Sequence, residues 1–142
     1  MMIEVVNRQR KMTMELERWQ AFAEEVLGVV SPNGAGATIA FVSDRAMSDL
    51  NRMWRHKQGT TDVLSFPAEQ DAFEKIEGLN LGDVVISTEQ ASRQAQEHEL
   101  SFDIEIARLI LHGLLHLCGY DHETDNGEMK RMEMRLRRKL GI

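Results

Sequence analysis

The fold of this chain is decided by SFDIEIARLILHGLLHLCGYDH, residues 101–122. A helix is predicted over residues 102–118, and apolar side chains occupy nearly all of its sides, which is typical of a helix buried in a core. Its polar positions are spaced by four, three, four and four residues, so they form one narrow stripe. This stripe consists of Ser101, Glu105, Arg108, His112 and His116. We therefore expect the rest of the chain to pack around this helix, except along the stripe.

The same stretch carries three histidines whose spacing predicts a metal site. His112 and His116 lie one turn apart on the polar stripe. Gly119 suits the left-handed position that ends a helix, after which the chain can bring His122 back towards the other two. Zinc accepts imidazole ligands well, and three protein ligands leave one coordination position open, as in catalytic sites. The negative end of the helix dipole also lies near the predicted cation.

Other interpretations of this segment are less consistent with its residues. A pair of histidines at i and i+4 is by itself more simply explained as solvated or hydrogen-bonded in the core, but the glycine turn and third histidine favour metal binding. Cys118 could be a fourth metal ligand by its position in sequence, but it points about 160° away from His116 on the helix, so we assign it to the core. The spacing also matches the metzincin peptidase pattern, but that chemistry requires a glutamate base where this chain has Gly113.

Outward from this stretch, the chain is predicted to form four strands and about five helices. Ser87 and Gln90 form a capping box that opens a polar helix. Pro67 is expected to stop the strand of residues 62–66. A fourteen-residue loop, 67–80, is long enough to suggest a function or partial disorder. Strands are predicted over 3–7, 37–43, 62–66 and 81–87, and helices over 14–27, 44–54, 88–99, 102–118 and from about 125. The helix over 44–54 has Met47, Leu50 and Trp54 along one side. This order predicts one α+β domain, residues 1–142, with a small mixed sheet of about four strands, about five helices and the metal site at a helix C-terminus.

Composition narrows the classes of protein that this chain can represent. Its 142 residues include a single cysteine, and no apolar run approaches the roughly 18 residues needed to cross a bilayer. We expect a soluble cytoplasmic protein with no membrane partner. The net charge of −6 opposes indiscriminate binding to nucleic acid but permits a local basic patch. The cations of the last helix are most simply its solvated face, with an RNA contact as the alternative: Arg131, Arg135, Arg137, Arg138 and Lys139.

Three segments together resemble a known family. They are HGLLHLCGYDH (112–122), LNRMWRHKQGTTDVLSFP (50–67) and LGDVVIS (81–87), and they are similar to the YbeY family of bacterial endoribonucleases, also called rRNA maturation factors. The resemblance implies one zinc ion held by His112, His116 and His122. It also implies a single-strand-selective, metal-dependent endoribonuclease that matures the 3′ end of 16S ribosomal RNA and serves ribosome quality control. The implied partners are ribosomal RNA and the ribosome or its small-subunit proteins.

The resemblance assigns a functional role to Arg55, which the residue alone would not justify. A phosphodiester gathers negative charge on its non-bridging oxygens near the transition state, and a metal and a guanidinium can share that charge. Water and the neighbouring ribose 2′-OH both remain possible nucleophiles. Asp121 either acts as a base, orients a ligand imidazole or only forms the turn. Asp83 shapes its strand or touches a substrate or partner, and His98 is expected to face solvent.

Two other functions remain open from the sequence. The first is a non-catalytic ribosome-assembly factor in which zinc braces a surface that binds RNA or protein. The second is a metallopeptidase-like hydrolase, which would act on peptides and leave RNA intact.

Overall fold

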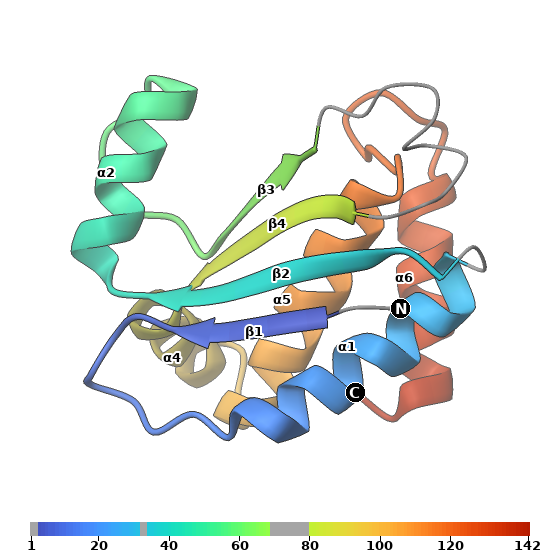
Figure 1. Cartoon of the computed structure of the whole chain (residues 1–142), viewed down its shortest axis with the longest axis horizontal. Coiled ribbons are helices and arrows are strands. Elements are labelled where there is room, and N and C mark those ends of the chain that lie inside the picture. Colours follow the sequence, from blue (N-terminus) through green and yellow to red (C-terminus); the bar gives the residue numbers. More distant parts are fainter. Residues whose placement is uncertain (1–2, 32–33, 69–79) are drawn as a thin grey trace.

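The computed structural model describes residues 3–31, 34–68 and 80–142. In these ranges four strands form one mixed sheet, and five helices pack around it (Figure 1). The strands are β1 (Ile3–Asn7), β2 (Gly36–Val42), β3 (Val63–Pro67) and β4 (Asn80–Ser87). The helices are α1 (Leu16–Val30), α2 (Asp44–Arg55), α4 (Thr88–Glu97), α5 (Phe102–Leu117) and α6 (Glu128–Leu140). The predicted α+β class is confirmed, whereas most of the predicted loop 67–80 lies outside the described residues.

The sheet has the strand order β1-β2-β4-β3, with β1, β2 and β4 parallel and β3 antiparallel to β4. Pro67 was expected to stop β3 but is its last residue, opposite Gly82 of β4. Because β3 is an edge strand, it tolerates a residue that donates no backbone hydrogen bond. Gly82 allows this pairing because a Cβ there would lie 2.2 Å from the carbonyl oxygen of Phe66.

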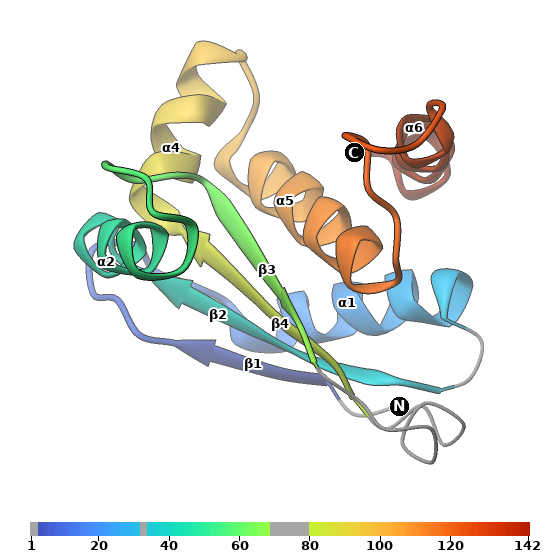
Figure 2. The ribbon, with the colours of Figure 1, turned by 90° about the horizontal axis from the view of Figure 1, so that it is seen from above.

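The two faces of the sheet bury different sets of side chains, since successive residues of a strand point to opposite sides. One face packs on α1 and α5 and forms the main core, to which β2 contributes Ile39 and Phe41. The other face carries a smaller hydrophobic cluster, which packs on Met47 of α2. Figures 1 and 2 show α5 behind the sheet, lying between α4 and α6. The predicted central helix is thus covered by the sheet on one side and by helices on others.

Helix starts follow the sequence at two positions and depart from it at a third. Ser87 and Ser101 accept hydrogen bonds from the backbone N–H groups three residues later. For α4 this is half of the predicted capping box, because the N–H of Ser87 donates to the carbonyl oxygen of Asp62 and not to Gln90. The last helix was predicted to begin near Asp125 but begins at Glu128. The Asp125 carboxylate instead accepts hydrogen bonds from the backbone of Gly127 and Met129, so it orders the turn before the helix.

Trp54 also differs from its predicted placement. It was expected to lie beside Met47 and Leu50 on one side of α2, but it is 64% exposed. Its ring meets Phe66 of β3 edge-on, with the centroids 6.2 Å apart. The helix buries Met47 and Asn51, and its C-terminal end projects from the sheet (Figure 1). Among the described residues, no helix combines the length and apolar character that a bilayer span requires.

We expect Asp44→Asn to lower the free energy of unfolding at neutral pH by about 1–3 kcal/mol, because this carboxylate accepts hydrogen bonds from Ser87, Arg93 and Thr60. Burial raises the pKa of Asp44, but these bonds and the charge of Arg93 outweigh it and hold the pKa below its ordinary value. The stabilisation is therefore present above about pH 4 and is lost as pH falls through the lowered pKa. Urea unfolding across this pH range checks the prediction, and a constant difference between the two proteins would contradict it.

Candidate metal centre

The three predicted histidines converge on one point. His112 and His116 lie on the last turns of α5, and His122 comes from the loop that follows. One ring nitrogen from each lies within 4.8 Å of the others, and the ring centroids are 4.8, 5.6 and 5.7 Å apart. Gly119 has a φ of +96°, so it ends the helix in the left-handed conformation predicted for it. The turn after α5 therefore carries His122 back to the other two imidazoles.

The chemistry of this cluster fits a metal ion. Imidazole binds metals in its neutral form. Burial lowers the pKa of His116, and the charges of His112 and His122 lower it further, so the neutral ring is favoured. The cluster supplies three nitrogen ligands, and no fourth protein ligand joins them among the described residues. A three-ligand set of this kind leaves a coordination position for substrate or water.

A buried carboxylate that sequence reasoning missed holds one of these rings. Oε1 of Glu133 lies 2.5 Å from Nδ1 of His112, and the Glu133 side chain is only 12% exposed. Burial raises the pKa of Glu133, but the contact with His112 and the charge of Arg137 outweigh it and lower the pKa overall. A carboxylate on one ring nitrogen fixes the tautomer and directs the other nitrogen to the metal.

One sequence signal could have found Glu133. On a helix of 3.6 residues per turn it lies between Met129 and Leu136, which are both buried. A carboxylate in the middle of an apolar helix face needs a partner. The identity of that partner depends on how α6 packs against α5, which spacing along the chain does not encode.

We expect Glu133→Gln to weaken metal binding about 10- to 100-fold, because the amide cannot match the carboxylate in orienting His112. Competition with a chromophoric chelator measures this affinity. Glu25→Gln on α1 removes an exposed carboxylate and is the matched control, with affinity expected to stay at the wild-type value. Equal affinities for Glu133→Gln and wild type would show that the carboxylate does not support the site.

Arg55 lies in the same pocket as the histidines. This pocket has a volume of about 350 Å³, and its described lining includes Arg55, His112, His116 and His122. Arg55 is the exposed last residue of α2, and His56 ends that helix in a left-handed conformation with a φ of 55°. Residues 61–65 of β3 and the segment before it form another wall. The fold thus brings together four site residues that are separated by up to 67 positions in sequence.

The other residues singled out from the sequence have different placements. Asp121 lines the pocket, but its carboxylate accepts a hydrogen bond from the backbone of Glu123, so it forms the turn. His98 is half exposed, with Nδ1 3.4 Å from Glu105. Asp83 is exposed on β4. Cys118 packs against the core as predicted, and burial raises the pKa of its thiol, which disfavours a thiolate ligand.

Gly113 explains why a peptidase base is absent. The residue faces the sheet rather than the pocket, and a Cβ there would lie 2.5 Å from Cγ1 of Val84 on β4. Val84 is fully buried, so it cannot move aside for a larger side chain. In this fold a glutamate at position 113 would meet β4 and could not serve as a base beside the histidines.

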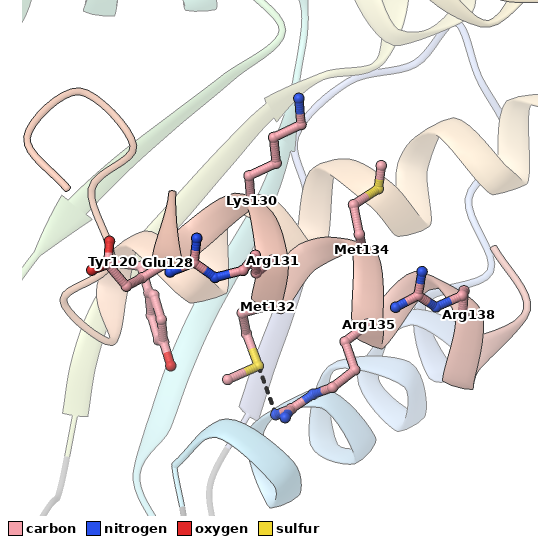
Figure 3. A pocket seen from close by; sticks show the side chains of 8 residues that line it. All are labelled: Tyr120, Glu128, Lys130, Arg131, Met132, Met134, Arg135 and Arg138. Atoms are coloured by element: carbon pink, nitrogen blue, oxygen red, sulfur yellow. Dashed lines mark hydrogen bonds between the residues drawn. The ribbon is translucent and has the colours of Figure 1, made fainter. Parts of the chain in front are cut away.

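The cations of α6 divide between two faces of the helix. Lys130, Arg131, Arg135 and Arg138 are exposed and line a groove of about 790 Å³ on the outer side (Figure 3). This fits their interpretation as a solvated face. The same interpretation was wrong for Arg137, which turns inward and places Nη2 3.5 Å from Oε2 of Glu133.

The fold and the histidine cluster define an α+β protein with a candidate catalytic metal centre. The profile of the family described as Endoribonuclease YbeY matches residues 4–141. A protein of Geobacter metallireducens named Endoribonuclease YbeY is 34% identical over 143 residues, covering 100% of this chain and 95% of the relative. A protein of the same name from Alkaliphilus metalliredigens is 38% identical, covering 96% of this chain and 93% of the relative.

A solution structure of a protein from Thermotoga maritima has a similar fold, with a TM-score of 0.63 and 24% identity, covering 94% of this chain and 85% of that one. The chain belongs to the endoribonuclease YbeY family, as its profile match and its relatives show.

Proposed function

We propose that this protein is a zinc-dependent endoribonuclease that cleaves single-stranded RNA, with the 3′ end of 16S ribosomal RNA as its substrate. The observation that carries the proposal is the pocket in which His112, His116 and His122 lie beside Arg55. The relatives named as endoribonucleases support it, since they align over nearly the whole chain. The chain as a whole, residues 1–142, acts as one domain in this proposal.

The metal ligands, Arg55 and Glu133 have separate chemical roles in this proposal. A zinc ion held by the three imidazoles would supply Lewis-acid stabilisation of negative charge on the phosphate. Arg55 binds the non-bridging oxygens through its guanidinium, which can donate two parallel hydrogen bonds. Glu133 keeps His112 in the ligand tautomer. On a protein of net charge −6, these local positive charges determine where a phosphate can bind.

The nucleophile is either a water molecule or the ribose 2′-OH next to the scissile phosphate. Attack by the 2′-OH breaks the bond to the 5′ oxygen of the next nucleotide, leaving a 2′,3′-cyclic phosphate and a 5′-hydroxyl. Attack by water leaves a linear phosphate on one of the two ends. Asp121 lies in the pocket as a candidate base, although one of its oxygens already accepts a hydrogen bond. Analysis of the product ends separates the two routes.

A cleavage assay tests the proposed function. The metal-replete protein is incubated with a single-stranded RNA and with a duplex of the same sequence, before chelation, after chelation and after zinc is restored. We expect cleavage of the single strand only, lost on chelation and regained with zinc. Intact RNA in every arm would contradict the proposal, and RNA binding without cleavage would favour the non-catalytic assembly factor.

The proposal also places the protein in the cytoplasm and in contact with the ribosome or its small-subunit proteins. Cosedimentation of the protein with purified ribosomal subunits measures this association directly.

A further inference from the structure

A second cleft adjoins the metal pocket. It has a volume of about 490 Å³, and both cavities are lined by Asp62, Val63 and His112. Beyond these shared residues it is lined by polar side chains of three helices, namely Gln94, His98, Glu105, Arg108 and Arg137. Glu105, Arg108 and His112 belong to the polar stripe predicted for α5. The stripe therefore runs along a cleft that leads away from the histidines.

The carboxylates in this cleft already have hydrogen-bond partners. Nε2 of Gln94 donates to Oδ2 of Asp62 at 3.1 Å and to Oε1 of Glu105 at 3.2 Å. The other oxygen of Asp62 accepts a hydrogen bond from the backbone N–H of Val63 at 2.8 Å. Nδ1 of His98 lies 3.4 Å from Oε2 of Glu105. The acceptors in the cleft are thus engaged within the protein itself.

Each arginine in the cleft keeps one donor without a partner. The Nε atoms of Arg108 and Arg137 are buried and have no hydrogen-bond partner among the residues that the structure describes. A buried donor without a partner costs free energy, so a shift of either side chain that brings its Nε to an acceptor in the cleft would be favourable. A guanidinium matches the oxygens of a phosphate or carboxylate. The unused capacity of the cleft therefore suits an oxyanion.

The position of Arg108 indicates which oxyanion. Arg108 lies one turn before His112 on α5, about 6 Å along the helix axis. A strand whose scissile phosphate lay beside the histidines would thus bring a neighbouring phosphate near Arg108. Arg137 approaches the same cleft from α6.

We propose that this cleft binds the backbone phosphate next to the scissile one, through Arg108 and Arg137. The proposal rests on the proposed function, because it assumes that an RNA strand occupies the metal pocket. It assigns Arg108 to binding of the substrate strand and gives Arg137 two contacts, one with Glu133 and one with the phosphate.

Adjacent arginines on α6 provide a matched control. Arg137 lines the cleft, whereas Arg138 is exposed on the outer groove (Figure 3). Arg137→Gln and Arg138→Gln therefore remove the same charge from positions about 100° apart around one helix. General attraction between a basic helix and RNA would make the two variants equivalent, whereas the proposed subsite would not.

The first test is equilibrium binding of a short 2′-O-methyl RNA strand, checked to remain intact, by the metal-replete protein at several salt concentrations. We expect Arg108→Gln and Arg137→Gln each to weaken binding about tenfold. Each should also reduce the slope of log affinity against log salt by at most about 0.7, the value for one phosphate contact on a single strand. Arg138→Gln should change affinity by less than about twofold. Wild-type affinity in Arg108→Gln, or equal losses in all three variants, would overturn the proposal.

The second test identifies the phosphate. In a strand with a known cleavage site, a neutral methylphosphonate replaces the phosphate on either side of the scissile one. At one of these positions the wild type should lose about tenfold in affinity, while Arg108→Gln, which keeps only the contact with Arg137, should lose clearly less. Additive losses at both positions would contradict the assignment. Arg108→Lys, which keeps the charge, should fold as wild type and retain part of the affinity.

These measurements separate the subsite from the proposed function. If the wild type binds the strand but cuts no RNA, the proposed function fails, while the contrast between Arg108→Gln and Arg138→Gln still decides whether the cleft binds phosphate.

Discussion

His116→Ala is expected to abolish metal binding and RNA cleavage together. His116 is one of the three imidazoles that share a common centre, and the substitution leaves only two nitrogen ligands. Structural and catalytic zinc sites use at least three protein ligands, so the ion should be lost during purification. Because a Lewis-acid metal contributes several kcal/mol to catalysis, we expect cleavage to fall by about a thousandfold or more. Elemental analysis and the cleavage rate are measured on the same preparation.

Cys118→Ala is the control for this prediction. Cys118 lies two residues from His116 but packs against the core, so its removal should leave both metal content and cleavage near wild type. Loss of metal from Cys118→Ala would show that the thiol is a ligand. A His116→Ala protein that still holds one metal ion and cleaves RNA would show that the three imidazoles do not form the site.

Arg55→Ala is expected to keep the metal and to lose cleavage by about 100- to 1000-fold, the effect of removing one donor that stabilises transition-state charge. Arg55 lines the pocket but contributes no nitrogen to the histidine cluster, so metal content should not change. Arg55→Lys should recover only part of the rate, because an ammonium group keeps the charge but cannot donate the two parallel hydrogen bonds.

Arg52→Ala provides a matched control on the same helix. Arg52 lies nearly one turn before Arg55, is exposed and pairs with Asp49 at 3.2 Å, outside the described lining of the metal pocket. We expect its cleavage rate to stay within about twofold of wild type. Equal losses in Arg52→Ala and Arg55→Ala would indicate that general positive charge at this end of α2 attracts RNA. A normal rate in Arg55→Ala would remove the arginine from the mechanism.

The parts of the fold that were predictable depend on local periodicity. The apolar sides of residues 102–118 predicted a buried helix, and the spacing of its polar stripe predicted which side stays open. The turn at Gly119 could be predicted because a left-handed residue that ends a helix favours glycine. These signals lie within about twenty residues, so local spacing was sufficient to predict the histidine cluster.

The parts that were missed depend on packing between distant elements. Glu133 lies 21 residues after His112, and only the approach of α6 to α5 joins them. Arg137 was grouped with a solvated face because its charge resembles that of its neighbours, whereas the contact with Glu133 turns it inward. Trp54 was expected in the core from its spacing, but α2 extends beyond the sheet at that point. Sequence spacing defines the faces of a helix, whereas tertiary packing determines which partner each face meets.

The most direct test of the metal centre is a crystal structure of the purified protein with anomalous scattering recorded on both sides of the zinc absorption edge. We expect one zinc peak per chain, bonded at about 2.0–2.1 Å to one nitrogen each of His112, His116 and His122, with a further position open towards Arg55. Imidazole rings turned away from one another, or a zinc peak elsewhere in the chain, would contradict this prediction.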